Sequence, residues 1–256
     1  MFQHAIVRMP GENFADGLTT VDFGKPDFSR VLAQHAAYCD ALEECGLQLV
    51  RLDADLDHPD STFVEDAAVL TAKSAILTRP GAPSRLGEVA ALRDVVERFY
   101  STIHQIESPG TLDGGDICEA GPHFFIGISH RTNEEGARQL SKFLAAEGYT
   151  WSMVDIRDLT SILHLKSGVA YLNDNKLVVM KELAHRKEFA GYDLVLVPAQ
   201  ECYACNCVLV NDRVLVPAGF SWLDATLTRL GYKPLRLDMS EFRKMDGGLS
   251  CLSLRF

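Results

Sequence analysis

Short apolar runs and polar turns alternate along the chain in a pattern that recurs. Residues 63–81 show it first, as a polar turn, an apolar segment, a second polar turn and another apolar segment that ends in Pro-Gly. Short apolar runs bounded by turn residues are typical of paired β-strands. The same order is repeated in residues 112–129, 164–180 and 204–219, so the chain predicts four similar hairpins.

A fifth copy is divided between the two ends of the chain. The tail, residues 246–254, supplies a polar turn and one apolar strand, and the head, residues 4–9, supplies the second strand. Pairing these segments joins both termini in one repeat. We therefore expect the last residues to be tied into a sheet, although chain ends often fray.

Helical periodicity follows most of these hairpins. Residues 27–45 and 85–99 place apolar side chains near one face of a helix, whereas residues 181–190 are only weakly helical. A short apolar strand comes after each of the five connections, at residues 47–52, 103–107, 151–156, 194–198 and 234–238.

Two sequence patterns predict where further helices begin. Thr132 and Glu135 have the spacing of a capping box, in which the two side chains bond each other's backbone N–H groups. Ser221 and Asp224 form a weaker pattern of the same kind. We expect helices to start at both places.

The repeat is therefore strand, strand, helix, strand, five times over. Five such ββαβ units, each burying one face against its neighbours, can close into a ring with every polar turn facing a central channel. The sequence thus predicts an α/β fold, a five-bladed α/β propeller formed by residues 1–256 as a single domain. One ordinary mixed α/β sheet is the alternative that this pattern leaves open.

Charge and composition exclude several classes of partner. The net charge is −10, and no cluster of Lys and Arg supplies the basic surface that nucleic acids and anionic membranes require. The N-terminus has no secretory signal pattern, and no apolar run reaches the ~18 residues of a membrane span, so a cytoplasmic protein is expected. The acidic balance is compatible with a cationic small-molecule substrate.

Seven cysteines without a regular spacing indicate reduced thiols rather than a disulfide framework. Three of them lie in residues 202–207, CYACNC, which suggests zinc as an alternative. No second pair of Cys or His at zinc-finger spacing accompanies them, so we expect buried thiols there. Neither a metal site nor a cofactor is predicted, because the Gly-rich segments also lack phosphate-binding spacing.

If the polar turns of the five units converge, they bring together a cysteine, a histidine and several carboxylates. A thiolate is a strong nucleophile, an imidazole moves protons at neutral pH, and a carboxylate can orient that imidazole. Each residue also has a simpler explanation, with Cys251 in the core, His164 satisfied within a strand, and the carboxylates as turn formers. The converging residues are Glu65, Asp66, Asp113, Asp116, His164, Asn206, Asp246 and Cys251.

Eight segments are more specific in combination than any of them alone. They are DGLTT (16–20), PDSTFVED (59–66), RPGAPSRLGE (79–88), PGTLDGGD (109–116), GISHRTNEEGARQ (127–139), LHLKSG (163–168), AGF (218–220) and KMDGGLSCLSLRF (244–256). In this order, and nearly from end to end, they resemble the dimethylarginine dimethylaminohydrolases, or dimethylargininases, of the guanidine-modifying enzyme superfamily. The resemblance implies the pentein fold, a five-bladed α/β propeller, which is the ring that the repeats predict.

The resemblance also implies an activity and its catalytic residues. The reaction is hydrolysis of Nω,Nω-dimethyl-L-arginine and Nω-monomethyl-L-arginine to L-citrulline plus dimethylamine or methylamine, through a covalent S-alkylthiouronium on cysteine and without a cofactor. Cys251 matches the nucleophile, His164 the general acid and base, and Asp113 the third catalytic acid. Some bacterial members carry Glu where Asp113 stands, so the carboxylate is kept with a shorter reach.

Substrate-binding roles are carried over in the same way. Asp66 and Asp113 match the residues that grip the guanidinium, and Arg85 and Arg131 match those that hold the α-carboxylate. Charge-assisted, often bidentate contacts make arginine suited to that task. The remaining matches are Leu18, at a lid position over the pocket, and Asp60 and Glu65 around the substrate.

Two other functions stay open at this point. The first is an arginine deiminase-like hydrolase acting on arginine or another alkylguanidine, although those enzymes usually carry an additional helical domain for which 256 residues leave no room. The second is a protein that binds a cationic ligand without catalysis. The expected partner in either enzyme is a small molecule, here a methylated arginine, and a homodimer is compatible with the resemblance.

Overall fold

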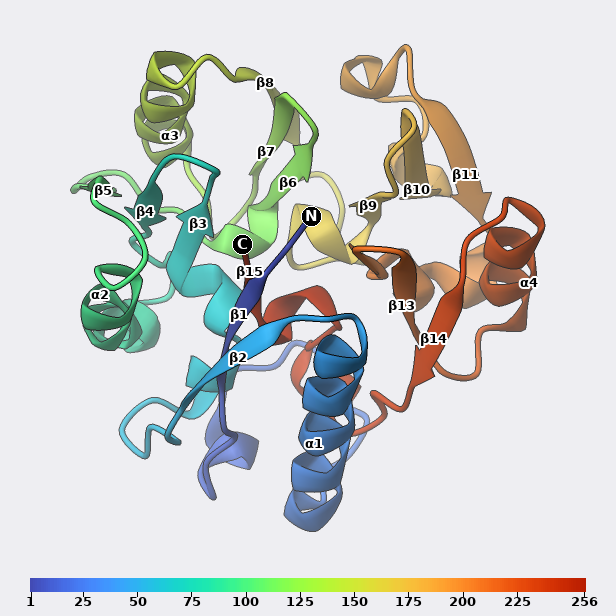
Figure 1. Cartoon of the computed structure of the whole chain (residues 1–256), viewed down its shortest axis with the longest axis horizontal. Coiled ribbons are helices and arrows are strands. Elements are labelled where there is room, and N and C mark those ends of the chain that lie inside the picture. Colours follow the sequence, from blue (N-terminus) through green and yellow to red (C-terminus); the bar gives the residue numbers. More distant parts are fainter. The chain divides into compact units, whose positions relative to one another are not determined.

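Five three-stranded sheets with the same strand connectivity make up the computed structural model, which describes residues 1–256 (Figure 1). In every sheet the first two strands pair antiparallel. The second strand is parallel to the third in the sheets built around β1, β4, β7 and β13. The predicted fivefold repeat is confirmed, and the alternative of one mixed sheet is wrong.

Two compact units divide the chain, the first formed by Met1–Val64 with Val197–Phe256 and the second by Glu65–Leu196. The single-domain organisation of residues 1–256 stays a prediction. No helix in either unit has both the length and the apolar character needed to cross a membrane.

The first unit holds two of the sheets and a core of aromatic side chains. Phe14 and Phe242 pack edge to face with ring centroids 5.4 Å apart, and Phe63 packs beside both. The sheet strands are β1 (His4–Arg8), β2 (Gln48–Leu52) and β15 (Leu254–Arg255), then β12 (Val208–Val210), β13 (Arg213–Pro217) and β14 (Pro234–Leu237), with helices α1 (Phe28–Glu44) and α4 (Ser221–Arg229).

The two chain ends meet in one sheet of this unit, as predicted. In the antiparallel pairing of β15 with β1, Ala5 lies opposite Arg255 and Ile6 opposite Leu254. The carbonyl of Phe256 accepts hydrogen bonds from two N–H groups near the N-terminus, each at 2.8 Å. Figure 1 shows both strands side by side, with β2 on the other side of β1.

Deleting residues 252–256 should therefore prevent stable folding. Leu252, Ser253 and Leu254 are buried, and the Ser253 hydroxyl bonds the hydroxyl of buried Tyr38 at 2.7 Å. Burial of each leucine contributes about 1.5–3 kcal/mol, so the combined loss is comparable with a total stability of about 5–15 kcal/mol. Circular dichroism during thermal unfolding checks this, and a cooperative transition at the wild-type temperature would contradict it.

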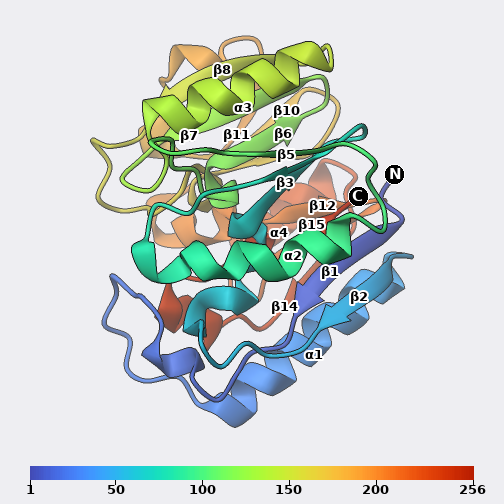
Figure 2. The ribbon, with the colours of Figure 1, turned by 90° about the vertical axis from the view of Figure 1, so that its left-hand side faces the viewer.

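The second unit holds the other three sheets, and α3 lies against β7 and β8 (Figure 2). The segment at 181–190 forms only two 3-10 turns, in agreement with its weak periodicity. The strands are β3 (Ala68–Leu70), β4 (Ala75–Leu77), β5 (Ile103–Gln105), β6 (Ile117–Ala120), β7 (His123–Ile128), β8 (Thr150–Asp155), β9 (Val169–Tyr171), β10 (Lys176–Met180) and β11 (Asp193–Val197), with helices α2 (Ala90–Val96) and α3 (Glu134–Ala146).

Both predicted helix starts are confirmed to within two residues, but neither predicted capping pattern forms. The N-cap of α3 is Asn133, whose side chain accepts from Gly136 N–H, because the Thr132 hydroxyl accepts instead from Asp113 N–H at 3.1 Å. Helix α4 does begin at Ser221, but no side chain of its own caps it. The carboxylate of Glu201 accepts the first helical N–H groups from outside the helix.

Candidate active site

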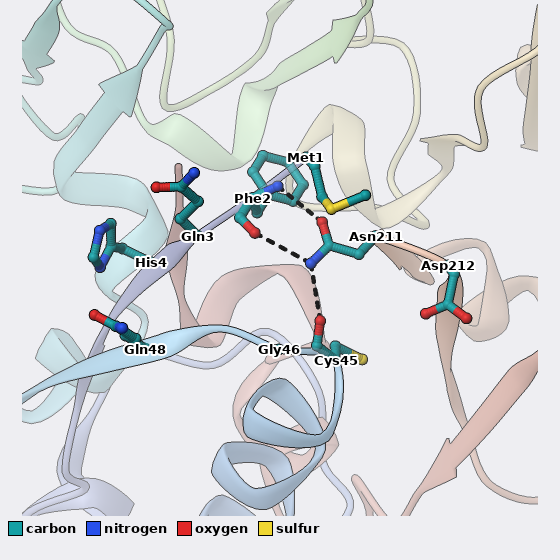
Figure 3. Close-up of a pocket in the computed structure, with 9 residues that line it drawn as sticks. All are labelled: Met1, Phe2, Gln3, His4, Cys45, Gly46, Gln48, Asn211 and Asp212. Atoms are coloured by element: carbon teal, nitrogen blue, oxygen red, sulfur yellow. Dashed lines mark hydrogen bonds between the residues drawn. The ribbon is translucent and has the colours of Figure 1, made fainter.

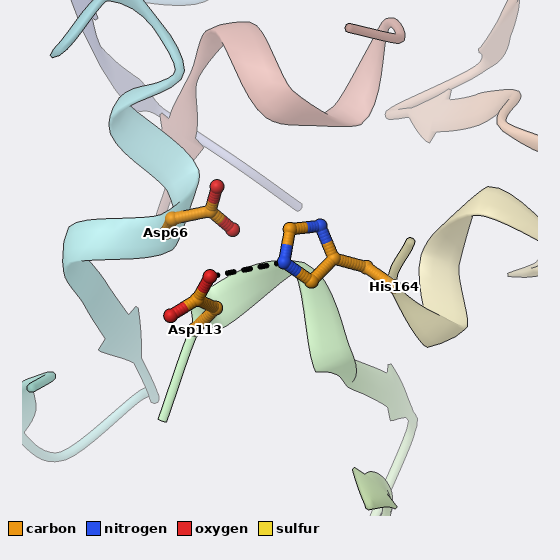
Figure 4. A group of neighbouring side chains, drawn as sticks. All are labelled: Asp66, Asp113 and His164. Atoms are coloured by element: carbon orange, nitrogen blue, oxygen red, sulfur yellow. Dashed lines mark hydrogen bonds and ion pairs between the residues drawn. The ribbon is translucent and has the colours of Figure 1, made fainter. Parts of the chain in front are cut away.

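A buried cluster of two carboxylates and one histidine lies in the second unit (Figure 4). Asp66, Asp113 and His164 come from the polar turns that precede β3, β6 and β9, so three copies of the repeat contribute one side chain each. One polar atom from each residue lies within 4.8 Å of the other two. The structure thus brings these three predicted residues together.

Asp113 holds the imidazole of His164 in place. Asp113 Oδ2 lies 3.0 Å from His164 Nε2, and Asp113 is fully buried. The other oxygen, Oδ1, accepts a hydrogen bond from Gly81 N–H at 2.8 Å. A carboxylate held in this way orients the ring and favours its charged form.

Asp66 is the second carboxylate of the cluster and is held by two donors. Its Oδ2 accepts from Arg85 Nη1 at 2.6 Å, and its Oδ1 accepts from Gly115 N–H at 2.8 Å. Burial alone would raise the pKa of Asp66, but the charges of His164 and Arg85 and these hydrogen bonds lower it to about 2. Asp66 is therefore ionised at neutral pH.

His164 carries a proton that its surroundings stabilise. Burial disfavours the imidazolium, but the carboxylates of Asp66, Asp113 and Asp116 outweigh burial and raise the pKa of His164 to about 9. The ring is therefore charged at neutral pH and can donate a proton.

This raised pKa predicts a loss of stability at alkaline pH. The stabilisation is fully present below about pH 6.5 and disappears as the pH rises through about 9, because the unfolded chain releases the His164 proton first. We expect about 3 kcal/mol of the free energy of unfolding to depend on it. The free energies of unfolding of the wild type and of His164→Gln are measured in urea between pH 6 and pH 9.5. Their difference cancels the other titrating groups and should become smaller as the pH rises. A difference that does not change with pH contradicts the prediction.

Neighbouring atoms lie too close to the two glycines of LDGGD to leave room for a side chain there. A Cβ atom on Gly115 would lie 2.8 Å from both Asp66 Oδ1 and His164 Nδ1. A Cβ atom on Gly114 would lie 2.0 Å from the carbonyl oxygen of Glu65. A larger residue at Gly115 would displace Asp66 or His164, and one at Gly114 would displace the backbone of Glu65.

Arg85 is buried between two protein carboxylates. Nη1 faces Asp66, while Nε and Nη2 donate to Glu88 at 2.9 and 2.8 Å. Arg85 therefore fixes Asp66 in the cluster. Its contact with a substrate carboxylate stays a prediction. The role of Glu88 was not predicted, although its position three residues after Arg85 was a visible signal.

The other two predicted substrate-binding residues of this unit have different surroundings. Glu65 is buried, and its Oε1 lies 2.7 Å from Lys166 Nζ. Arg131 is half-buried, its backbone N–H donates to Ser129 Oγ at 2.9 Å, and its guanidinium has no ion-pair partner in the structure. Arg131 thus offers an unmatched positive charge to an anionic group of a ligand.

Asp66, Asp113 and His164 have the residue types of a metal site, since each offers one ligand atom. In the folded chain, however, Asp113 Oδ2 already bonds His164 Nε2, and Asp66 Oδ2 already accepts from Arg85 Nη1. Each carboxylate keeps acceptor lone pairs beyond the two that are used. This arrangement suits a cation that carries N–H donors better than a bare metal ion.

Cys251 lies in a 3-10 turn, Ser250–Leu252, of the first unit. The residue is half-buried and packs against the core of that unit. Asn206 fixes the turn, because its side-chain oxygen accepts from Ser250 N–H at 2.9 Å and its nitrogen donates to Ser250 Oγ at 3.0 Å. A Cβ atom on Gly248 would lie 2.5 Å from that Asn206 oxygen, so glycine is needed in DGGLSC.

Tyr203 also holds this turn and was not singled out from the sequence. Its hydroxyl donates to the carbonyl of Gly247 at 2.8 Å, and the guanidinium of Arg243 lies 4.7 Å from its ring centroid. Tyr203 belongs to CYACNC, in which Cys205 and Cys207 are buried. No group of three potential metal ligands includes these cysteines.

Leu18 and Asp60 meet in the first unit as well. Both carboxylate oxygens of Asp60 accept from Leu18 N–H, at 3.0 and 3.2 Å. Thr20 N–H donates to Asp246 Oδ2 at 2.5 Å, while Leu18 is 43% exposed. The loop is anchored through its backbone, which leaves the Leu18 side chain available to contact a ligand.

A pocket of about 550 Å³ lies elsewhere in the first unit, beside the N-terminus (Figure 3). The side chain of Asn211 bonds the N–H and carbonyl of Phe2 and the carbonyl of Cys45 there. None of the predicted site residues lines it. The lining residues are Met1, Phe2, Gln3, His4, Cys45, Gly46, Gln48, Asn211 and Asp212.

Comparison with known proteins gives consistent matches. A model of the arginine deiminase family matches residues 57–193. The chain is 46% identical over 257 aligned residues to N(G),N(G)-dimethylarginine dimethylaminohydrolase from Pseudomonas aeruginosa, with both chains covered in full. A solved structure of that bacterium's enzyme, a cysteine-to-serine mutant in complex with citrulline, has a TM-score of 0.97 at 46% identity and full coverage of both chains. A histidine-to-glycine mutant of a dimethylarginine dimethylaminohydrolase, solved as an adduct with S-methyl-L-thiocitrulline, has a TM-score of 0.96 at 46% identity, also with full coverage.

Proposed function

The chain belongs to the dimethylarginine dimethylaminohydrolase family, and from this membership we propose how its own residues carry out the family's reaction. The enzyme hydrolyses Nω,Nω-dimethyl-L-arginine and Nω-monomethyl-L-arginine to L-citrulline plus dimethylamine or methylamine. The observation that carries this function is 46% identity over the whole of both chains. The buried carboxylates beside a charged histidine support it, because they suit a guanidinium.

Asp66 and Asp113 hold the substrate guanidinium. Both are buried carboxylates with remaining acceptor lone pairs, and Asp66 stays ionised over the whole physiological pH range. Hydrogen bonds from the guanidinium nitrogens to these oxygens fix the position of the central carbon and keep the group cationic. A cationic carbon is the better electrophile for a thiolate.

Cys251 is the nucleophile and His164 moves the protons. The Cys251 thiolate forms a C–S bond to the guanidinium carbon, and His164 gives its proton to dimethylamine as the C–N bond breaks. This leaves a covalent S-alkylthiouronium on Cys251. His164 then takes a proton from water, whose oxygen attacks the same carbon. Breakage of the C–S bond releases the thiolate and citrulline, and the remaining hydroxyl proton passes to the released dimethylamine.

The amino-acid end of the substrate is held by the remaining predicted residues. Arg131 is the better-supported ligand for the α-carboxylate, because its guanidinium has no protein partner whereas that of Arg85 faces Asp66 and Glu88. Leu18 covers the substrate from a loop that Asp60 anchors. Glu65, held by Lys166, completes this set.

One product assay tests the function against its alternatives. Purified protein is incubated separately with dimethylarginine and with arginine, and citrulline, dimethylamine and ammonia are measured. Equal amounts of citrulline and dimethylamine from dimethylarginine are expected. Ammonia and citrulline formed from arginine alone would indicate arginine deiminase activity. No product from either substrate would indicate a binding protein.

We also propose that the enzyme works in the cytoplasm and that it forms a homodimer. Light scattering coupled to size-exclusion chromatography checks the second property. The expected mass is twice the chain mass of 28.3 kDa. A species with the mass of one chain at all working concentrations would contradict it.

A further inference from the structure

Asp116 is a buried carboxylate that the reaction described above does not use. It ends the LDGGD turn, has no exposed surface, and gives each of its two oxygens a different partner. Oδ1 accepts from Leu165 N–H at 3.0 Å, and Oδ2 accepts from the Ser129 hydroxyl at 2.7 Å. The two partners belong to separate segments that each carry a residue of the proposed site.

The first partner fixes the backbone next to His164. Leu165 directly follows His164, and its buried side chain packs so closely on β7 that a Cβ atom on Gly127 would lie 2.9 Å from Leu165 Cβ. The bond from Leu165 N–H to Asp116 therefore sets the direction in which the chain presents the imidazole. Asp113 then holds the ring itself at Nε2.

The second partner fixes the turn that carries Arg131. While Ser129 Oγ donates to Asp116, it accepts from Arg131 N–H at 2.9 Å and from Thr132 N–H at 3.0 Å. The Thr132 hydroxyl in turn accepts from Asp113 N–H at 3.1 Å. These bonds form a closed circuit that runs from Asp113 through Thr132, Ser129, Asp116 and Leu165 to His164, and back to Asp113.

We propose that Asp116 is a positioning residue that aligns His164 for proton transfer and, through Ser129, the turn that holds Arg131. The proposal rests on the roles proposed above for His164 and Arg131. Because the two oxygens serve different segments, the two effects can be separated by mutation. Loss of the Leu165 contact acts on kcat, and loss of the Ser129 contact acts on KM.

Three variants make that separation. Asp116→Ala removes both contacts and should lower kcat about 100-fold, the cost of misplacing a catalytic group by about 1 Å. Asp116→Asn keeps an acceptor oxygen for Leu165 N–H, so its kcat should be at least about tenfold higher than that of Asp116→Ala. Ser129→Ala keeps the bond from Leu165 N–H to Asp116 and removes the hydroxyl that holds the turn with Arg131, so KM should rise about tenfold with kcat within about threefold of wild type.

The second unit offers a matched control in Thr71. Its buried hydroxyl accepts from Lys73 N–H and Ser74 N–H and donates to the carboxylate of Glu147, which copies the bonding of Ser129 in a different turn. Thr71→Val should lower the thermal unfolding temperature about as much as Ser129→Ala does and leave kcat and KM for dimethylarginine unchanged.

The measurement is steady-state citrulline formation by wild type and the four variants, with unfolding temperatures beside it. The positioning role is wrong if the wild type forms citrulline but Asp116→Ala keeps kcat within twofold of it. The role is also wrong if kcat falls in proportion to the unfolding temperature in all variants, including Thr71→Val. If the wild type itself forms no citrulline, the proposed function fails instead. Equal kcat losses in Asp116→Asn and Asp116→Ala would also overturn the role of the Leu165 contact.

Discussion

Replacing Cys251 with serine should abolish turnover of dimethylarginine while the substrate still binds. A serine hydroxyl is far less acidic than a thiol and is a much weaker nucleophile at neutral pH, so no covalent intermediate forms. Loss of a catalytic nucleophile lowers kcat by a factor between about 10³ and about 10⁶. The guanidinium ligands Asp66 and Asp113 are unchanged, so isothermal titration calorimetry should detect binding within about tenfold of the wild-type affinity.

Cys202→Ser is the matched control for this prediction. Cys202 is half-buried like Cys251 and lies in the same unit, where its thiol contacts the carbonyl of Pro198 at 3.8 Å. This variant should keep wild-type kcat, because Cys202 has no place in the proposed chemistry. A Cys251→Ser protein that produced citrulline at more than about one hundredth of the wild-type rate would remove Cys251 from the mechanism.

Replacing His164 with glycine should separate the two halves of the reaction. Without the imidazole, a poor leaving group such as dimethylamine is not protonated, and kcat for dimethylarginine should fall about 10²–10⁴-fold. A substrate with a good leaving group, such as S-methyl-L-thiocitrulline, needs no proton to depart, so its thiol should be released once. The adduct then persists, because no base activates water.

The measurement is a burst experiment with S-methyl-L-thiocitrulline. One equivalent of methanethiol per active site should appear in the first turnover, with little citrulline after it. His58→Gln is a suitable control, since His58 pairs with Asp55 on the first unit outside the proposed site. Continued citrulline release by His164→Gly at the wild-type rate would show that another group activates water.

The repeat architecture could be predicted because local sequence patterns indicate each of its elements. Each hairpin depends on short apolar runs and the turn residues between them, and these signals need no knowledge of distant partners. The same reasoning joined the two termini, because β15 and β1 each lacked half of a repeat. Pairing of Ile6 with Leu254 confirms that step.

Helix caps could not be predicted where the partner is distant in the sequence. The hydroxyl of Thr132 satisfies Asp113 N–H in place of the helix, so Asn133 becomes the cap. Glu201 caps α4 from a neighbouring turn, which no local pattern of Ser221 and Asp224 could reveal. In both cases a tertiary hydrogen bond overrides the local preference.

For the site, the sequence indicated the residue types and the turns but not the pairings. The cluster of Asp66, Asp113 and His164 follows from the repeat, because equivalent turns in neighbouring copies each contribute one residue. The enclosure of Arg85 by Asp66 and Glu88 does not follow, since it depends on the buried geometry of the folded chain. The circuit through Asp116 has the same origin, because it consists of hydrogen bonds between segments.

Trapping the covalent intermediate on the wild-type enzyme shows which cysteine attacks the substrate. Enzyme mixed with dimethylarginine is quenched in acid during the first turnovers, digested, and mapped by mass spectrometry across all seven cysteines. We expect one modified peptide, in which Cys251 carries the mass of the substrate less dimethylamine. Citrulline formation with an unmodified Cys251, or with the adduct on another cysteine, would contradict it.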